Sequence, residues 1–525
     1  MSFRANRNQQ ITLNDRTTQL TDRELNVLRN SWAETFANEV FPEINEKRFS
    51  VLFNDEGRSN TPVNVVIGSL LIKEMLDLTD DEILEAVMLN IQVQYSLHLT
   101  SFKEIPFSDR TLSRFRARLL QYEEKTGIDL LKMEVLSLAE LAKVKLGVSD
   151  RLRRMDSLMV SSNCKRMARL ELFYTCTAAL VSVYAKDKGE TCLPEQLVRY
   201  TKAEDKNATI YRAKSGEAQE RLEIVFADAL LIKGLCDGEF DDCEEYKLLV
   251  RMLDDQTEGG NLKKGKDIKP TSLQNPSDGD ATFRRKAGKE HTGYVANIVE
   301  SCGEDTNIID DYAFEQNIHS DQAFAADIIN SYGDDAEGAV IVCDGGYASE
   351  KNFDNAEDKN IELATTCLTG AEPNKILLDF EIAGDAITGC PAGHKPYDTY
   401  YNRRTETLNA YFEKGTCCAC PYKDQCPVIM QKKRAVVRFT DTSYNRAVQA
   451  VKIDGERYKE LAKKRNGIEG VPSVLRRKFN VDSMPIFGMA RSKLWFGIKI
   501  AAVNVCRLVA ALKRQDPATG VVCPI

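Results

Sequence analysis

The sequence lacks any run of about 18 uncharged apolar residues, the length that a membrane-spanning helix needs. The nearest candidate, 494–512, contains Lys499 and Arg507 and is better interpreted as an amphipathic helix. The N-terminus, MSFRANRNQQ, has no apolar segment behind its charges, so it does not have the pattern of a signal peptide. These absences predict a protein of the cytosol or nucleoid with no membrane partner.

The chain is also too long for a single ordinary core. At 525 residues, a prior of about 150 residues per domain predicts three or four domains. Hydrophobic residues make up 43% and charged residues 29%, which is typical of globular proteins and not of disordered ones. We find no internal repeat, so the fold has to be inferred from local patterns.

The net charge of −8 conceals a strong separation of charge along the chain. Residues 300–337 contain eleven Asp or Glu and no Lys or Arg, whereas residues 431–478 contain fourteen Lys or Arg and five acids. This separation is compatible with a basic surface for polyanions and an acidic region for cations. Two differently solvated faces would produce the same pattern.

Helical and strand patterns alternate along the chain. Thr21 begins a capping-box pattern, and residues 60–150 have a helical period. A helical stretch over 165–255 follows the first apolar strand, and residues 380–430 look irregular and rich in cysteine. The remainder looks basic and helical. Alternation of strands with helices predicts a mixed or parallel sheet. We expect strands at 152–160, 292–300, 308–314, 338–343 and 361–366.

A short basic helix is expected over residues 108–120. Ser108 is its predicted N-cap after a turn at Pro106, and the apolar stripe would be Leu112, Phe115 and Leu119. Such a helix is compatible with a helix-turn-helix DNA reader, although exposed helix faces are often basic. The candidate DNA contacts are Arg110, Arg114, Arg116 and Arg118.

Three acids are candidates for a cation site. Asp156 interrupts an apolar strand, and Asp344 ends the apolar strand of GAVIVCDGG, where open α/β sheets place their sites. Glu469 lies in the basic region between Arg465 and Arg476, on one helix face if Pro472 does not break the helix. Three carboxylates that converge would bind two Mg²⁺ ions for phosphodiester chemistry, with the arginines on phosphates.

Fifteen cysteines in a chain of this kind do not indicate a disulfide framework. Cys176, Cys343 and Cys506 have apolar neighbours and are expected to be buried. A second group supplies four thiolates for a structural metal, with zinc as the first choice and an iron–sulfur cluster as the alternative. In this group Cys418 is an extra thiol and His394 a possible substitute ligand; unligated thiols are a further alternative. The four proposed ligands are Cys390, Cys417, Cys420 and Cys426.

Four segments resemble motifs of bacterial insertion-sequence transposases of the DDE class. FSDRTLSRFRARL resembles part of their N-terminal domain, and MDSLMVSSN resembles the motif of the first acid. VCDGGYASEKNF resembles the motif of the second acid, and RNGIEGVPSVLRRKF resembles that of the third. The resemblance implies that Asp156, Asp344 and Glu469 are the catalytic metal ligands.

The third motif departs from the family pattern of Tyr, Arg, Glu and Lys. Ala462 holds the Tyr position and Arg476 the Lys position, while Arg465 and Glu469 fit. The family also has an Asn-x-His-x-Asp-like segment before the second acid, which Asn317–Asp321 matches; His319 would serve equally as a structural hydrogen-bonding residue.

The resemblance implies an α/β ribonuclease-H-like catalytic core with an all-α N-terminal domain, a helical insertion and a small Cys-rich insert. We therefore expect a DNA-binding domain over 1–150, the first core strand in 151–165, the helical insertion over 166–270, the core sheet over 271–375, the Cys-rich insert over 376–435 and a basic helical end of the core over 436–525.

The expected function is that of a transposase that uses Mg²⁺ (or Mn²⁺) to cleave transposon ends and join the 3′-hydroxyl to target DNA. Its partners would be double-stranded DNA and a second copy of the chain, at the bacterial nucleoid in the cytoplasm. The alternatives are a catalytically inactive DNA-binding protein derived from a transposase, and a metal-dependent DNA nuclease.

Overall fold

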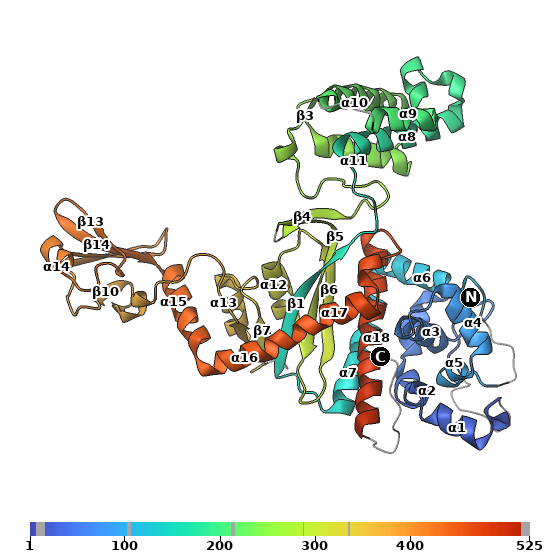
Figure 1. Ribbon diagram of the computed structural model, residues 1–525, viewed down its shortest axis with the longest axis horizontal. Helices are drawn as coiled ribbons and strands as arrows, with labels where there is room; N and C mark the ends of the chain where they lie inside the picture. The colour runs from blue at the N-terminus through green and yellow to red at the C-terminus, as the bar shows by residue number, and fades with distance from the viewer. Residues whose placement is uncertain (7–15, 102–106, 212–215, 287, 334–336, 516–525) are drawn as a thin grey trace.

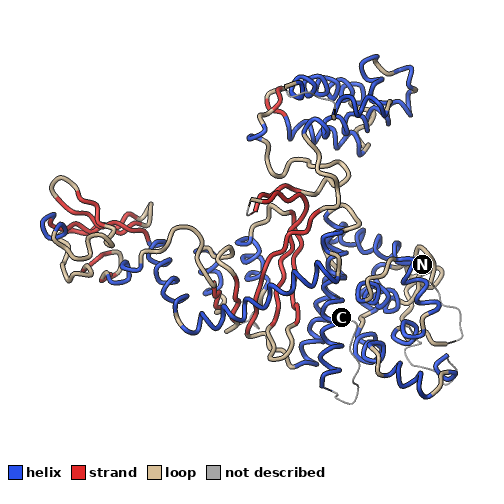
Figure 2. Tube along the Cα trace, viewed as in Figure 1, coloured by secondary structure: helices blue, strands red, loops and turns tan. Residues whose placement is uncertain are grey.

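The computed structural model describes residues 1–6, 16–101, 107–211, 216–286, 288–333 and 337–515. Its architecture is mixed α/β. A block of N-terminal helices lies beside a central sheet, and two smaller parts project from that sheet, one helical and one mostly of strands (Figures 1 and 2).

The N-terminal block is helical, as its sequence period predicts. The predicted capping box is present. The Thr21 side chain accepts a hydrogen bond from the Glu24 N–H, and the Glu24 carboxylate accepts one from the Thr21 N–H. The stripe of Leu112, Phe115 and Leu119 is buried. The principal helices are α1 Asp22–Arg29, α2 Trp32–Thr35, α3 Val63–Met75, α4 Asp80–Leu89, α5 Ile91–Ser96, α6 Thr111–Thr126 and α7 Leu130–Leu146.

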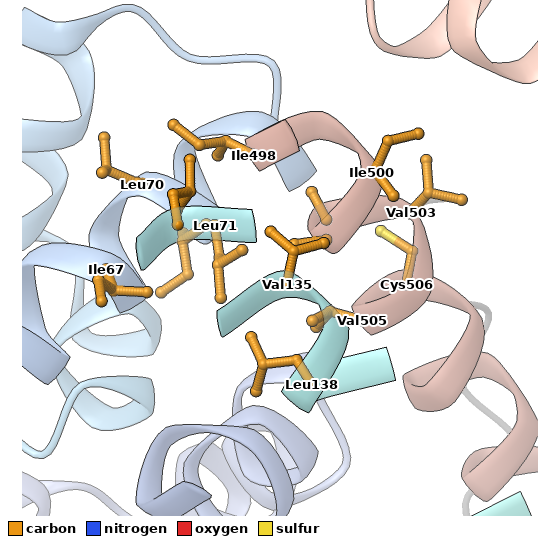
Figure 3. Packing of buried hydrophobic residues seen from close by; sticks show 14 of the residues in the cluster. Ile67, Leu70, Leu71, Val135, Leu138, Ile498, Ile500, Val503, Val505 and Cys506 are labelled. Atoms are coloured by element: carbon orange, nitrogen blue, oxygen red, sulfur yellow. The ribbon is translucent and has the colours of Figure 1, made fainter. Parts of the chain in front are cut away.

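The C-terminal helix α18, Met489–Gln515, is a core helix and not the amphipathic helix that we expected. It packs against α3, α7 and strand β6 (Ile308–Gln316), and Figure 3 shows its apolar side chains among those of α3 and α7. By length and composition α18 would suffice to cross a membrane, but almost all of its most apolar stretch is buried inside the protein. Its charges are compensated within the core: Lys499 pairs with Glu74, and Arg507 pairs with Glu300.

The central sheet contains every strand that the sequence predicts. Its path is β4-β5-β1-β7-β8, and β6 pairs with β5. β5 is antiparallel to β1 and β6, whereas β7 is parallel to β1 and β8, so the sheet is mixed as expected. The bounds are β1 Leu152–Ser161, β4 Thr282–Lys286, β5 Lys289–Ser301, β6 Ile308–Gln316, β7 Val340–Cys343 and β8 Glu362–Thr365.

Helices cover both faces of this sheet. On one face, α12 (Asp321–Ser331) and α13 (Glu350–Asp358) enclose a small apolar cluster that includes Met155, Phe324 and Ile341. On the other face, α17 (Gly470–Lys478) and α18 join the larger core, to which β1 contributes Leu158 and Val160. The helix α16 (Glu456–Asn466) also contacts β1 and β7 on this face but buries no residue of its own. The sheet therefore has a buried interior on each side.

A helical part lies between β1 and β4 in the chain. It has a hydrophobic cluster of its own, built around Phe173, Leu197 and Ile232, and it projects from the end of the sheet (Figure 1). Its elements are α8 Arg169–Lys188, α9 Ala203–Ile210, α10 Glu217–Cys236, α11 Glu244–Gln256, β2 Thr257–Glu258 and β3 Asn261–Leu262.

The cysteine-rich segment is not irregular, contrary to our expectation. It forms a two-stranded sheet, β10-β9, and a four-stranded sheet, β11-β12-β14-β13. Strand β14 also lies in the region that we expected to be helical, and α15 follows it. The apolar alternation that builds these strands is short, which hid them among the cysteines and turns. The elements are β9 Glu381–Ala383, β10 Ala386–Gly389, β11 Asp398–Asn402, β12 Thr407–Glu413, α14 Lys414–Cys418, β13 Val428–Met430, β14 Arg434–Thr440 and α15 Asp441–Asp454.

Candidate functional site

Asp156 and Asp344 come from neighbouring parallel strands. The register of β1 and β7 pairs Arg154 with Val342. Continued by two residues, the same register places Asp156 beside Asp344. Side chains two residues apart share one face of a sheet, so both carboxylates lie on the face that α16 covers. The fold thus brings together two acids that are 188 residues apart.

Arg465 joins all three predicted acids. One of its terminal nitrogens lies 3.3 Å from Asp156 and 3.8 Å from Asp344, and the other lies 2.9 Å from Glu469. The Arg465 side chain is only 12% exposed, whereas that of Glu469 is 63% exposed. The three carboxylates therefore surround one buried cation, with Glu469 on the solvent side.

The strand β1 itself fixes the position of Arg465. Arg154, two residues before Asp156, donates to the Lys464 carbonyl at 2.6 Å and is paired with the fully buried Glu300. Gly467 permits this contact, since a Cβ there would lie 2.3 Å from the Arg154 guanidinium. Neither Arg154 nor Gly467 carries a sequence signal that we recognised. Pro472 lies in α17 just after a short 3₁₀ turn, 467–469, so helical backbone continues past Glu469.

The surroundings of Asp156 disfavour its charge. Burial raises the pKa of the Asp156 carboxyl; the Arg465 charge and the Ser157 N–H oppose this rise, while the Asp344 charge adds to it. A further positive charge nearby would offset both the cost of burying the ionised Asp156 carboxyl and its repulsion by Asp344.

Asp321 lies at the edge of the same site. It accepts from the Ser157 hydroxyl at 2.8 Å, and Lys286 lies 3.5 Å from its carboxylate. A Cβ on Gly346 would touch the carboxylates of both Asp321 and Asp344. The Asn317–Asp321 resemblance includes this acid, but Lys286 is a lone strand lysine without any motif. His319 instead contacts Asp327 at 2.9 Å.

Arg476 does not join the carboxylate cluster. It lies 3.3 Å from Asp482 and donates to the Met159 carbonyl at 3.4 Å. Its side chain is exposed at the far end of α17, so a contact with DNA there would be separate from the acids.

The four arginines of α6 form two pairs with different surroundings. Arg116 makes a two-pronged ion pair with Asp80, at 2.6 and 2.8 Å, and the Arg118 guanidinium lies 4.9 Å from the centre of the Phe53 ring. Arg110 and Arg114 are exposed and have no ion-pair partner within the described part of the chain. Of the four candidate DNA contacts, Arg116 and Arg118 are therefore engaged within the domain, whereas Arg110 and Arg114 face solvent.

The start of α6 differs from the prediction. The helix begins at Thr111 with Arg110 in the cap position, and the Ser108 N–H donates to the Thr111 hydroxyl instead of the Ser108 side chain capping the helix. The turn expected at Pro106 lies outside the described residues.

The four predicted cysteine ligands line one small cavity. Its volume is about 20 Å³, and His394 also borders it, whereas the exposed Cys418 does not. Burial raises the pKa of the Cys426 thiol to about 11, and neighbouring Cys417 and Cys420 add to the rise. Cys176, Cys343 and Cys506 are buried, as predicted.

Within the described ranges, no three His, Cys, Asp or Glu side chains are already arranged to hold a metal ion. Arg465 lies among the three carboxylates, and the four thiols share the lining of one cavity.

Two protein-family models match the chain. The model described as "Transposase DDE domain" matches residues 389–509, and the one described as "Transposase domain (DUF772)" matches residues 28–118. No curated protein and no solved structure matches. The first match includes the cysteine cavity, Arg465 and Glu469, and the second includes all four candidate arginines at α6. These matches confirm the resemblance to bacterial insertion-sequence DDE transposases and indicate a function in DNA transposition.

Proposed function

We propose that the protein is a DDE transposase that cleaves DNA at transposon ends and joins the freed 3′-hydroxyl to target DNA. The observation that carries this proposal is the convergence of Asp156, Asp344 and Glu469 on Arg465. The three acids were identified from separate sequence motifs, and they are far apart in sequence. Their convergence in space is what a shared site predicts. The transposase family matches support the same conclusion.

The donor set of this site fits hard divalent cations. Mg²⁺ and Mn²⁺ prefer carboxylate oxygens, and Asp156, Asp344 and Glu469 offer only these. The site already accommodates one positive group, the Arg465 guanidinium. When bound, such ions polarise a phosphoryl oxygen and activate the attacking one. Asp321 is a further oxygen donor at the edge of the site.

The protein's own cations would hold the DNA. Lys286 and Arg465 flank the carboxylates, and α16 continues outward with Lys459, Lys463 and Lys464. Phosphate contacts of this kind position DNA without reading its sequence. Before DNA and metal arrive, Arg465 keeps the three carboxylates from repelling one another.

We also propose that the sheet is the ribonuclease-H-like core of the family. Three antiparallel strands followed by two parallel ones, with α12 and α13 on one face and α16 to α18 on the other, support this assignment. The helices α8–α11 would then be the insertion between its first two strands.

Arg110 and Arg114 would contact the transposon end, whereas Arg116 and Arg118 stabilise the domain through Asp80 and Phe53. Two copies of the chain would pair two DNA ends in the bacterial nucleoid, since transposition joins both ends of one element to the target DNA.

We propose a zinc ion for the cysteine cavity. Four thiols of one small module suit a tetrahedral structural site. Thiolates also hold iron–sulfur clusters, so iron with visible absorbance would be the contrary result.

The proposal is tested with purified protein, DNA bearing the ends of the element, and a target plasmid. We expect Mg²⁺-dependent cleavage and joining by the wild type. Asp156→Asn and Asp344→Asn should each reduce both steps by at least about a hundredfold, because a lost metal ligand costs several kcal/mol. Asp354→Asn is the matched control, since Asp354 is an exposed acid on α13.

The outcomes separate the alternatives. Binding of the ends without cleavage would indicate an inactive DNA-binding protein. Cleavage without joining would indicate a nuclease. Full activity in either site variant would exclude the assigned acids.

A further inference from the structure

In the four-stranded sheet β11-β12-β14-β13, one face packs on the core of its module, and the other carries exposed long side chains above the buried Asn409 and Val436. Its inner face carries Leu408, Ala410, Phe412, Val437 and Phe439, which pack against Leu377, Phe380, Ile387 and Ala447. Alternation of side chains along each strand sends the intervening residues to the outer face. Figure 1 shows the sheet at the outer end of its module, away from the core.

The outer face combines aromatic rings with arginines. Tyr400, Asn409 and Arg438 form a row across three strands, and Arg438 donates to Asn409 at 2.8 Å. Tyr411 lies in the next row, between Asp398 and Val436. Arg434 is paired with Glu413 one row further on, and its guanidinium lies 4.3 Å from the centre of the Tyr411 ring. Tyr401, by contrast, points inward and donates to Asp441 at 2.6 Å. The alternation along β11 therefore places Tyr400 on the outer face and Tyr401 on the inner face.

Two of these rings are open to solvent. Tyr397 is 61% exposed and Tyr400 is 57% exposed, and the Tyr397 and Tyr411 ring centres are 6.4 Å apart. Folding leaves such large rings in water without a gain in burial. Flat aromatic and guanidinium groups on an open sheet are the surfaces on which unpaired bases stack.

The charge of this module complements a nucleic acid. Residues 390–440 contain nine Lys or Arg and four Asp or Glu, although the whole chain has a net charge of −8. Arg403 and Arg404 occupy the β11–β12 turn, and Lys432 and Lys433 precede β14 beside Arg434. These cations at the edge of the sheet could contact phosphates while the bases stack on the tyrosine rings.

We propose that the outer face of this sheet binds single-stranded DNA, with bases stacked on Tyr397, Tyr400 and the Arg434–Tyr411 pair. The choice of DNA rests on the proposed function, in which strands must separate near a cut end. A duplex conceals its base faces and would use only the charges, so the exposed rings favour an unpaired strand.

The test measures binding of a fluorescent oligo(dT) of about 16 nucleotides to the full-length protein in buffer without added divalent cations. Replacing both exposed rings, Tyr397→Ala with Tyr400→Ala, should weaken binding by at least about 25-fold, because each lost base stack costs about fivefold or more. Tyr397→Phe with Tyr400→Phe should retain wild-type affinity. Tyr211→Ala, which removes an equally exposed ring on the helical part, should have no effect.

Two results would overturn the proposal. Wild-type affinity of the double alanine variant, with an unchanged melting temperature, would exclude stacking on these rings. An equal loss on single-stranded and duplex DNA would indicate a duplex surface instead. Because the assay requires no cleavage, its outcome is independent of the acids. If the rings are needed for binding but the wild type does not cleave DNA, only the transposase proposal is contradicted. If the wild type cleaves DNA but the double alanine variant binds oligo(dT) normally, only the single-strand proposal is contradicted.

Discussion

The Arg465 guanidinium lies 3.3 Å from the Asp156 carboxylate, inside the group of acids that the motifs identify. Both side chains are largely buried, and burial raises the pKa of Asp156. A buried carboxylate requires a compensating cation. In the absence of metal, Arg465 provides that charge from the protein's own chain, and it therefore competes with any divalent ion for the same oxygens.

Removing this competitor should increase the affinity for metal. We expect Arg465→Ala to bind Mn²⁺ on the order of tenfold more tightly than the wild type in the absence of DNA, because the attraction of the guanidinium no longer has to be overcome. Isothermal titration calorimetry measures the change directly.

Arg457→Ala is the control, since it removes the same charge from α16 at an exposed pair with Glu362. An Mn²⁺ affinity that is equal in all three proteins would mean that Arg465 and metal do not share these carboxylates. The Arg465 variant should also lose DNA cleavage, because the phosphate contact disappears.

The contact between Arg154 and the Lys464 carbonyl should depend on Gly467. In Gly467→Ala the new Cβ would overlap the Arg154 guanidinium, which the buried Glu300 holds in place. We expect a loss of about 1–3 kcal/mol in the free energy of unfolding, from a displaced buried hydrogen bond.

Gly470→Ala supplies the matched change. Gly470 is three residues along the same helical segment and has open space around its Cα, so alanine should stabilise the protein by about 0.4–1 kcal/mol. Denaturant unfolding of both variants gives the comparison. Equal stabilisation by the two alanines would show that Arg154 does not fix α16.

The cysteine cavity should contain about one zinc per chain, measured by elemental analysis. Cys420→Ser should release the metal and lower the melting temperature, because the binding energy of a structural metal is also folding energy. Cys418→Ser should retain both, since Cys418 is exposed and does not line the cavity. Iron with visible absorbance would favour a cluster, and protein prepared without oxygen that contains neither metal would contradict the site.

The strands of the central sheet could be predicted because their signals are local. The run of Val340–Cys343 is apolar and short, and it is bounded by glycines, so its length and neighbours identify it. The strands of the cysteine module could not be recognised, since β11 and β13 have little apolar alternation of their own and pair only through β12 and β14. Helix α18 was misjudged for a related reason: its two internal charges suggested a solvent face, but Glu74 and Glu300 compensate them inside the core.

The acids of the site could be found by motif, but their connection could not. Spacing identifies Arg465 and Glu469 as helix neighbours, whereas the approach of Arg465 to Asp156 depends on how α16 crosses β1 and β7. Likewise, nothing near Arg116 in the sequence indicates its pairing with Asp80, which comes from a different helix. Long-range packing decides both cases, and local periodicity does not contain that information.

The two pairs of arginines on α6 should therefore behave differently when they are replaced. Arg110→Ala with Arg114→Ala should weaken binding to the transposon end without a change in melting temperature. A base contact would appear as a loss of about 1–3 kcal/mol on the end and little on random DNA. A phosphate contact would weaken both DNAs and lower the salt slope by about one per residue.

Arg116→Ala should instead reduce stability, by up to about 1 kcal/mol, since the pair with Asp80 is partly exposed. Burial raises the pKa of the Asp80 carboxyl, but the hydrogen bonds and charge of Arg116 lower it by more. The net shift of this pKa is therefore downward. A lowered carboxyl pKa means that this contribution is fully present at neutral pH and is lost as the pH falls from the ordinary Asp pKa through the lower pKa of the folded state. The difference in unfolding free energy between wild type and variant should thus shrink on acidification. A DNA-binding defect in Arg116→Ala as large as that of the Arg110 and Arg114 variant, at equal stability, would return Arg116 to the recognition surface.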